Sequence, residues 1–392
     1  MIILHTSDWH LGKIFFGKKL TEEQAIFFEK NFFPLLKDIK PDLIIVTGDI
    51  IDRPNPDYET QRLFCEILLK LFKEKIPCIF ILGNHDSKRI TLFKEFLKYN
   101  NLIIIDDLSY FTNPIPWENE KGEKIYLYPL PYLSFYEFKE NLENLCKKTF
   151  FQKNQFTLKD LVEILINLKE NFLLKPAILL GHFAIEEGIF CGEEFPLTII
   201  GNEEIFPLIL FENFDVLLLG HLHRIQKIKE KVFYAGSILP YSFEEAKFKK
   251  GMWLLEIKNG ILIKDENIFL DPPMKLKTIK GYFKDLIKSP PDNAYLKVIL
   301  QDKEPVLHPF ERLKSIFPNL LALEYEEKHT SFYFKDFSME EISSNSKIEI
   351  NEEKLFKDFY KYVEEKEIEE KLFHIFKKYL KEFKEENMEK EV

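Results

Sequence analysis

Short apolar runs alternate with longer segments of helical periodicity along the first half of the chain. Three apolar runs that end in polar residues predict buried strands: Ile2–Thr6, Leu43–Thr47 and Cys78–Leu82. Three further segments carry apolar side chains at helical spacing and predict helices: 22–37, 58–72 and 90–99. Strands that alternate with helices predict an α/β fold, in which a parallel or mixed sheet carries helices on its faces.

The pattern changes near residue 129. Pro129-Leu130-Pro131 interrupts the alternation, and a helix is expected over 158–171. Five later apolar runs predict strands: Ala177–Leu180, Val216–Leu219, Val232–Ala235, Met252–Ile257 and Ile261–Phe269. A shorter unit of three strands and two helices is expected over 275–325, after Asp271-Pro272-Pro273.

These breaks divide the chain into three predicted parts. We expect a layered α/β domain over 1–271, a small α+β domain over 274–335 and, after a Ser/Asn linker, a helical segment over 350–392. The helical segment carries two apolar stripes: Leu355, Phe356, Phe359, Tyr360 and Val363, and then Leu372, Phe373, Phe376, Leu380 and Phe383. Such stripes suit either a helix pair packed on its own protein or docking to a partner.

Composition narrows the class of protein. A chain of 392 residues, 45% of them apolar, is long enough for two or three domains with their own cores. No apolar run approaches the roughly 18–20 residues that span a bilayer, and no secretory signal is visible, so we expect a cytoplasmic protein without membrane contact. Four scattered cysteines argue against a zinc knuckle or a disulfide framework. The formal charge of −10 weighs mildly against nucleic-acid binding, although local basic patches matter more than the total.

Residues that can ligate metal ions follow five of the predicted strands. Four of these strands end in glycine, as follows: Gly48-Asp49, Gly83-Asn84-His85-Asp86, Gly181-His182 and Gly220-His221-Leu222-His223. The first strand leads to Asp8-Trp9-His10 without a glycine, and five of the nine histidines lie directly after these strands. Because strand ends converge at one edge of an α/β sheet, we expect these side chains to meet in one crevice.

The residue types in this crevice favour a pair of divalent ions. Nitrogen and oxygen ligands without thiolate suit Mn, Fe or Zn, and two ions about 4 Å apart can clamp a phosphodiester while one activates a water. Asp49 is the natural carboxylate to bridge the ions, and Asn84 offers a neutral oxygen. His85 is placed to hold the scissile phosphate or to protonate the leaving oxygen, and Asp86 is placed to orient His85.

The same motifs resemble a known superfamily. Asp-x-His, Gly-Asp, Gly-Asn-His-Asp, Gly-His and Gly-His-x-His resemble the calcineurin-like metallophosphoesterases. HTSDWHLG at 5–12, GNHDS at 83–87 and GSILPYSFEEAKFKKG at 236–251 resemble, more closely, the SbcD family of nuclease subunits of bacterial SbcCD complexes. The resemblance covers roughly the first 270 residues. It implies a metallophosphoesterase-type layered α/β sandwich with a small α+β capping domain and a C-terminal helical tail.

The resemblance also implies roles for single residues. It implies two groups of metal ligands that share one carboxylate: Asp8, His10, Asp49 and His223, and then Asp49, Asn84, His182 and His221. His85 would be the catalytic histidine. Some archaeal relatives carry a second active-site histidine where this chain has Asp52, so no role is transferred to that position.

Three kinds of partner follow from the resemblance. They are DNA, a second copy of the chain bound through the helices at 58–72 and 90–99, and an SbcC-type ATPase whose coiled-coil base would bind the C-terminal helices. Basic residues flank the motif loops and could contact DNA phosphates: Lys13, Lys18, Lys19, Arg53, Lys88, Arg89 and Arg224. For each of them singly, solvated surface charge is the alternative.

Three functions fit these features. The first is a Mn-dependent DNA nuclease with exonuclease and endonuclease action, which works with the ATPase on DNA ends, breaks and hairpins. The second is a stand-alone phosphoesterase on nucleotides or phosphoproteins, and the third is a non-enzymatic scaffold. The capping domain and the tail favour the first, because a stand-alone phosphatase needs neither. The complete ligand set argues against the third.

Overall fold

The computed structural model describes most of the first 326 residues and a few positions of the C-terminal segment. The described ranges are 1–146, 156–168, 173–191, 205–326, 356–357, 360, 372–377 and 380. The chain divides into two compact units, Met1–Glu327 and Lys328–Val392. The expected linker, three residues of the first apolar stripe (Leu355, Phe359 and Val363) and Phe383 of the second lie outside the described residues, so the docking tail stays a prediction.

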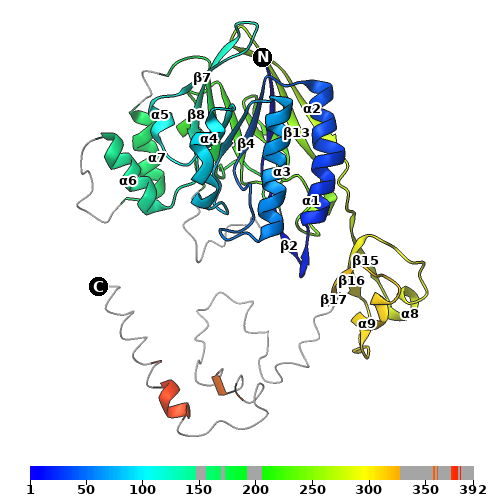
Figure 1. Cartoon of the computed structure of the whole chain (residues 1–392). Helices are drawn as coiled ribbons and strands as arrows, with labels where there is room; N and C mark the ends of the chain where they lie inside the picture. The colour runs from blue at the N-terminus through cyan, green and yellow to red at the C-terminus, as the bar shows by residue number, and fades with distance from the viewer. Residues whose placement is uncertain are drawn as a thin grey trace. The chain divides into compact units, whose positions relative to one another are not determined.

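Two six-stranded mixed sheets form the centre of the first unit (Figure 1). The first sheet has the order β14-β13-β1-β4-β5-β6. Its strands span Ile2–Thr6 (β1), Leu43–Thr47 (β4), Cys78–Ile81 (β5), Leu102–Ile105 (β6), Lys250–Lys258 (β13) and Ile261–Leu270 (β14). β1, β4, β5 and β6 run parallel, whereas β13 is antiparallel to β1 and β14.

The second sheet has the order β11-β12-β10-β9-β8-β7. Its strands span Ile115–Glu118 (β7), Lys124–Leu130 (β8), Ala177–His182 (β9), Val216–Gly220 (β10), Gln226–Ile228 (β11) and Val232–Tyr234 (β12). β8, β9, β10 and β12 run parallel, whereas β7 and β11 are antiparallel to their neighbours. The strands expected from apolar runs are therefore confirmed in both sheets.

The two sheets pack face to face, and helices cover their outer faces. On β4, Leu43 and Ile45 lie in the cluster between the sheets, together with Ile178 of β9. Ile44 and Val46 of the same strand point to the helices on the other side. Every residue of β4 is buried because both faces of the strand are covered. The layers run helix, sheet, sheet, helix, which confirms the layered α/β sandwich.

Helices α1 to α4 cover the first sheet, and α5 to α7 cover the second (Figure 1). The α-helices span Thr21–Phe27 (α1), Phe33–Ile39 (α2), Tyr58–Glu74 (α3), Lys94–Lys98 (α4), Ser109–Thr112 (α5), Phe135–Cys146 (α6) and Leu158–Asn167 (α7). Short 3-10 helices span Lys88–Phe93 (η2), Leu208–Phe211 (η5) and Glu245–Lys247 (η6). A small hairpin joins Ile14–Phe15 (β2) to Lys18–Lys19 (β3).

Three details differ from the expected elements. The segment 22–37 is not one regular helix, because a π-helical stretch, Phe28–Phe32 (η1), joins α1 to α2. The segment 90–99 begins as the 3-10 helix η2. Pro129 lies inside β8 rather than between elements. It is tolerated there because β7 stops pairing with β8 at Leu127, so that only β9 runs beside the proline.

A third, smaller sheet follows the two large ones. It consists of the parallel strands β15 (Leu276–Gly281), β16 (Tyr295–Leu300) and β17 (Leu320–Tyr325), with α8 (Phe283–Leu286) and α9 (Pro309–Lys314) beside them. An apolar cluster of its own includes Leu296, Val298 and Leu313. This is the small α+β unit expected after Pro273. The boundaries 1–271, 274–335 and 350–392 stay a prediction.

The described residues contain neither a disulfide nor a membrane span. None of the four cysteines, all of which the structure describes, forms a disulfide. No helix in the described part of the chain is long and apolar enough to cross a bilayer. The cytoplasmic location stays a prediction.

Candidate metal centre

The carboxyl ends of five strands, three from the first sheet and two from the second, meet at one place. Each strand leads into residues singled out from the sequence: β1 into Asp8 and His10, β4 into Asp49, β5 into Asn84 and His85, β9 into His182, and β10 into His221 and His223. The structure thus brings together side chains that lie more than 200 positions apart in the sequence, such as His10 and His223.

Glycine is needed at these strand ends because neighbouring strands pass too close for a side chain. A Cβ atom on Gly220 would lie 1.9 Å from the carbonyl oxygen of Thr47. A Cβ atom on Gly48 would lie 2.1 Å from Nδ1 of His182, and the φ of +88° at Gly48 favours glycine in addition. The recurring glycines therefore let the ends of the two sheets approach each other.

Four of the candidate residues adopt a left-handed backbone conformation. Their φ angles are 49° at Asp8, 43° at His10, 50° at Asp49 and 88° at His221. Residues other than glycine seldom take positive φ, and each such residue costs on the order of 1–3 kcal/mol. Strain of this kind gathers at functional sites, where the surrounding structure holds it in place.

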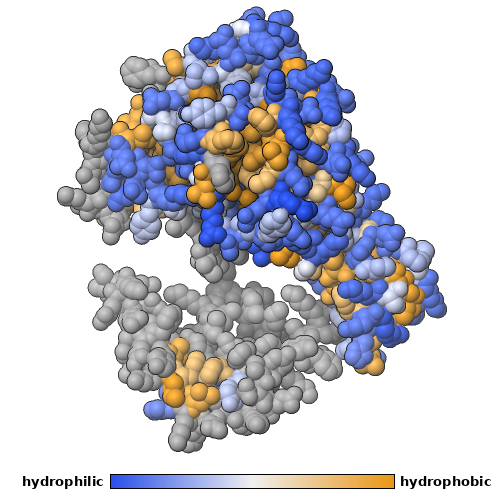
Figure 2. All heavy atoms as spheres, in the orientation of Figure 1, coloured by the Kyte–Doolittle hydropathy of each residue, from blue (hydrophilic) through white to orange (hydrophobic). Residues whose placement is uncertain are grey.

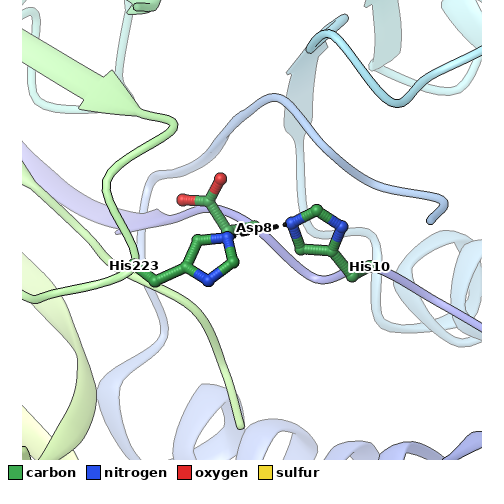
Figure 3. A group of neighbouring side chains, drawn as sticks. All are labelled: Asp8, His10 and His223. Carbon is green, nitrogen blue, oxygen red and sulfur yellow. Dashed lines mark hydrogen bonds between the residues drawn. The ribbon is translucent and has the colours of Figure 1, made fainter. Parts of the chain in front are cut away.

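Asp8, His10 and His223 form a first cluster of donor atoms (Figure 3). Their donor atoms lie within 4.8 Å of one another, and Nε2 of His10 faces Nε2 of His223 at 3.1 Å. All three side chains are buried, and Oδ2 of Asp8 has no hydrogen-bond partner. An unpartnered buried carboxylate oxygen is costly unless a cation sits beside it. The donor set of this first cluster therefore fits a divalent ion that accepts nitrogen and oxygen ligands.

Asp49 joins the first cluster to a second one, which consists of Asp49, Asn84 and His182. Oδ2 of Asp49 lies 3.4 Å from Nε2 of His10 and 3.3 Å from Nε2 of His182. Oδ1 of Asn84 lies 2.9 Å from the same nitrogen of His182. Nδ1 of His182 donates to the Thr47 carbonyl oxygen at 2.7 Å, because a carbonyl can only accept. Nε2 is therefore the atom of His182 that can bind a cation.

Electrostatics around Asp49 favour positive charge beside its carboxylate. Burial would lower the pKa of His182, but the charge of Asp49 raises it to about 9. Burial, together with the charge of His182, lowers the pKa of His221 to about 3. Burial also lowers the pKa of His10. His10 and His221 are therefore kept neutral, which is the form in which imidazole binds a metal ion.

His221 lies beside the second cluster. Its ring centroid is 5.4 Å from that of His182, and its backbone N–H donates to Oδ1 of Asp8 at 3.0 Å. The same carboxylate thus holds the loop after β10 through Oδ1, while its other oxygen, Oδ2, has no hydrogen-bond partner.

His85 forms a third group of possible ligands with His10 and Asp52. Its backbone N–H donates to Oδ1 of Asp49 at 2.9 Å, and its Nδ1 donates to the carbonyl oxygen of Asp52 at 2.9 Å. His85 is only partly buried, whereas His10 is fully buried. These contacts fix the ring while Nε2, the second nitrogen, can exchange a proton.

Asp86, expected to orient His85, forms its hydrogen bonds with the backbone. Its carboxylate accepts the backbone N–H groups of Gly83 at 2.9 Å, Ile51 at 2.9 Å and Ile50 at 3.2 Å. Asp86 therefore ties the loop after β5 to the loop after β4. The expected role of Asp86 in orienting His85 stays a prediction.

Two acidic residues that sequence reasoning left without a role stand behind the histidines. Oδ1 of Asp52 lies 3.3 Å from Nδ1 of His10, in a close contact that lacks hydrogen-bond geometry. Oε1 of Glu245 lies 3.1 Å from Nδ1 of His223, in hydrogen-bond geometry. The only sequence signal for Glu245 is its place in GSILPYSFEEAKFKKG, because 22 residues separate it from the histidine that it contacts.

The basic residues that could contact DNA each have a partner within the protein. The pairs are Lys13 and Arg53 with Asp52, Lys18 with Glu23, Lys19 with Asp57 and Glu59, Lys88 with Glu137, Arg89 with Asn55, and Arg224 over the ring of Phe248. The exposed ion pairs among them, such as that of Lys88 with Glu137, are weak enough to rearrange around a phosphate. DNA contact by these residues stays a prediction.

Comparison with known proteins places the chain in a family. The sequence profile of the calcineurin-like phosphoesterases matches residues 1–224, which hold all of the candidate ligands. The chain is 33% identical over 358 residues to the SbcD component of the SbcCD nuclease of Staphylococcus saprophyticus subsp. saprophyticus, and this match covers 89% of this chain and 92% of that protein. The chain belongs to the SbcD branch of the calcineurin-like phosphoesterase family. A second profile, the Type 5 capsule protein repressor C-terminal domain, matches residues 272–364 of this SbcD-family chain.

Solved structures show more distant likeness to the SbcD-family chain. A hypothetical protein from Thermus thermophilus is 14% identical and covers 70% of this chain and 100% of its own, with a TM-score of 0.38. The calcineurin-like phosphoesterase YfkN from Bacillus subtilis is 14% identical and covers 69% of this chain and 90% of its own, with a TM-score of 0.35. A dimetal phosphatase from Danio rerio is 11% identical and covers 69% of this chain and 99% of its own, with a TM-score of 0.39.

Proposed function

We propose that the chain is a metal-dependent DNA nuclease that acts with an SbcC-type ATPase on DNA ends, breaks and hairpins. The observation that carries the proposal is the meeting of five buried ligand-type side chains at the ends of strands from both sheets: Asp8, His10, Asp49, His182 and His223. Membership of the SbcD branch supports a phosphodiester as the substrate.

Within this proposal the site holds two divalent ions, and its nitrogen and oxygen donors favour Mn. The two ligand groups share one carboxylate: Asp8, His10, Asp49 and His223, and then Asp49, Asn84, His182 and His221. The position of Asp49 Oδ2 between His10 and His182 supports the shared role. When bound, such ions neutralise charge on the phosphoryl oxygens and activate a water.

His85 is the proposed catalytic histidine. Its ring is fixed through Nδ1, which donates to the Asp52 carbonyl oxygen. Nε2 is then the nitrogen that carries a proton to the leaving oxygen or contacts the scissile phosphate. The ring centroid lies 4.7 Å from that of His10, so His85 borders the ligand groups while its partial exposure leaves it within reach of a substrate.

A second copy of the chain is the proposed occupant of an apolar groove between α3 and the segment η2–α4. The groove has a volume of about 630 Å³, and its lining includes Phe64, Leu68, Phe72, Leu92 and Phe96. Figure 2 shows hydrophobic surface in this region, and Leu92 and Phe96 are exposed by 76% and 70%. An exposed apolar face of this kind marks an interaction site, and the family resemblance favours a homodimer.

The C-terminal helices are the proposed docking segment for the ATPase. The second sequence profile extends through residue 364, beyond the last strand of the small sheet, so the family relationship continues into the predicted tail. Packing of the tail on its own protein is the competing arrangement.

Cleavage of linear DNA in the presence of Mn tests the proposed function. We expect His85→Ala to lose cleavage while it still binds Mn, because His85 is placed in proton transfer and not among the ligands. His374→Ala is the matched control, since His374 is an exposed histidine of the C-terminal segment. Wild-type cleavage by His85→Ala would remove this residue from the mechanism. Activity confined to nucleotides or phosphoproteins would favour a stand-alone phosphoesterase instead.

A further inference from the structure

A buried ion pair stands behind His223. Glu245 on η6 is 1% exposed and Lys250 on β13 is 3% exposed, and Nζ of Lys250 lies 2.6 Å from Oε2 of Glu245. The desolvation of a buried ion pair often costs as much as the pair contributes, so stability alone does not account for it. Its position next to a candidate ligand offers another reason.

The pair holds His223 at two points. Oε1 of Glu245 accepts from Nδ1 of the His223 ring at 3.1 Å, while Nζ of Lys250 donates to the His223 carbonyl oxygen at 3.0 Å. Lys250 uses its other two N–H groups on Oε2 of Glu245 and on Oγ of Ser237, both at 2.6 Å. Oε2 also accepts the backbone N–H of Tyr241 at 3.1 Å. Oε1 is thus left to the histidine, and the ring and backbone of His223 are fixed together.

The acceptor of the Nδ1 proton is charged at His223 and neutral at His182. Nζ of Lys250 lies 2.6 Å from Oε2 of Glu245, so the group behind His223 is an ion-paired carboxylate. His182 donates its Nδ1 proton to a neutral acceptor, the Thr47 carbonyl oxygen. A carboxylate behind a ligating imidazole increases the basicity of the nitrogen that faces the metal, more than a carbonyl does.

We propose that Glu245 and Lys250 act as a positioning clamp for His223, and that this clamp makes the ion position at Asp8, His10 and His223 the tighter of the two. The inference rests on the proposed function, in which these residues are ligands. It adds an order of binding: the first cluster takes its ion at lower concentration, and the position at Asn84 and His182 fills afterwards. Glu245 does not touch the ion in this scheme and acts only through the histidine.

Calorimetric titration of the full chain with Mn²⁺ alone tests the clamp. We expect the wild type to bind two ions with unequal affinity. Glu245→Gln should weaken the tighter site by about 10–100-fold and leave the weaker site unchanged. A merely structural role would weaken both sites, so the selective change is the informative readout. Glu266→Gln is the control, because it breaks an exposed ion pair with Lys264 at 2.7 Å that lies outside the cluster.

Two further variants distinguish a failure of the clamp from a failure of the ligand assignment. The double variant Glu245→Gln/Lys250→Met leaves no buried charge unpaired and replaces Glu245→Gln if that protein does not fold. Unchanged affinity at both sites in the folded variant, or equal affinities in the wild type, would overturn the clamp. His223→Ala tests the ligand assignment by itself. If it binds both ions as the wild type does, the proposed metal centre is wrong. If His223→Ala loses the tight site but Glu245→Gln keeps it, the metal centre stands and only the clamp is refuted.

Discussion

The close approach of the two sheets at Gly220 allows a test of how strand spacing sets the metal centre. Gly220→Ala would add a methyl group 1.9 Å from the Thr47 carbonyl oxygen, 2.1 Å from Oγ of Ser7 and 2.9 Å from Nδ1 of His182. The Thr47 oxygen belongs to the backbone of a buried strand and cannot rotate away. Restoring an ordinary contact of 3.4 Å to that oxygen requires one strand end to move by about 1.5 Å.

This displacement acts on the ligands directly, because His221 and His223 follow Gly220 in the chain. Overpacking of this kind costs about 1–3 kcal/mol of folding free energy, so the variant should fold with a lower melting temperature. A misplacement of about 1 Å at a reacting centre can cost about 100-fold in rate. We therefore expect DNA cleavage to fall by at least about 100-fold, together with weaker Mn²⁺ binding.

Cleavage of linear DNA with Mn²⁺, calorimetric titration and thermal denaturation measure the three effects. Gly281→Ala is the matched control, because it places the same methyl group in β15 at ordinary distances of 3.4 Å or more from Leu286. The control should keep wild-type cleavage and affinity. If Gly220→Ala cleaves DNA at the wild-type rate, the glycine does not preserve strand spacing at the site and the reasoning is refuted.

Four further predictions follow from other parts of the molecule. Phe80 is fully buried, with its ring 5.8 Å from that of Trp9, so Phe80→Ala should lower the free energy of unfolding by about 3–5 kcal/mol in urea denaturation; a loss under about 1 kcal/mol would show that the core collapses around the gap. Phe96→Glu should convert a dimer to a monomer in light scattering, and an unchanged mass would remove the groove from the interface. A chain truncated after residue 345 should keep nuclease activity but fail to co-purify with the ATPase, so continued co-purification would contradict tail docking. Burial would raise the pKa of Glu245, but Lys250 lowers it below its usual 4.5, so its contribution to stability is present above that pH and is lost as the pH falls toward the lower folded value. The chelated wild type should therefore lose stability more steeply below pH 4.5 than Glu245→Gln/Lys250→Met, and equal slopes in thermal denaturation would contradict this.

Much of the fold could be predicted because the central strands are buried on both faces. A strand such as β4 is apolar throughout and ends abruptly in Gly48-Asp49, so its position and its end are both visible in the sequence. The π-helical stretch at Phe28–Phe32 was not visible, because its phenylalanines suit a regular helix equally well. The place of Pro129 inside β8 was also not predictable, because a proline is tolerated there only where the neighbouring strand β7 has stopped pairing.

The candidate ligands could be predicted for the same reason as the strands, because each follows a strand end directly. The residues behind them could not. Glu245 and Lys250 both lie in the stretch GSILPYSFEEAKFKKG, but they are ordinary charged residues in a lysine-rich and glutamate-rich chain, and the stretch does not show that they are buried. Only the fold shows that both are buried and that they converge on His223.

The mixed origin of the site has a consequence for how the chain is made. Its donors come from β1 at one end of the domain and from β10 at the other, and the clamp behind His223 lies later still, at Glu245 and Lys250. A nascent chain released before residue 250 lacks part of this constellation, whatever else it has folded. We therefore expect full metal affinity only after residue 250 has been synthesised.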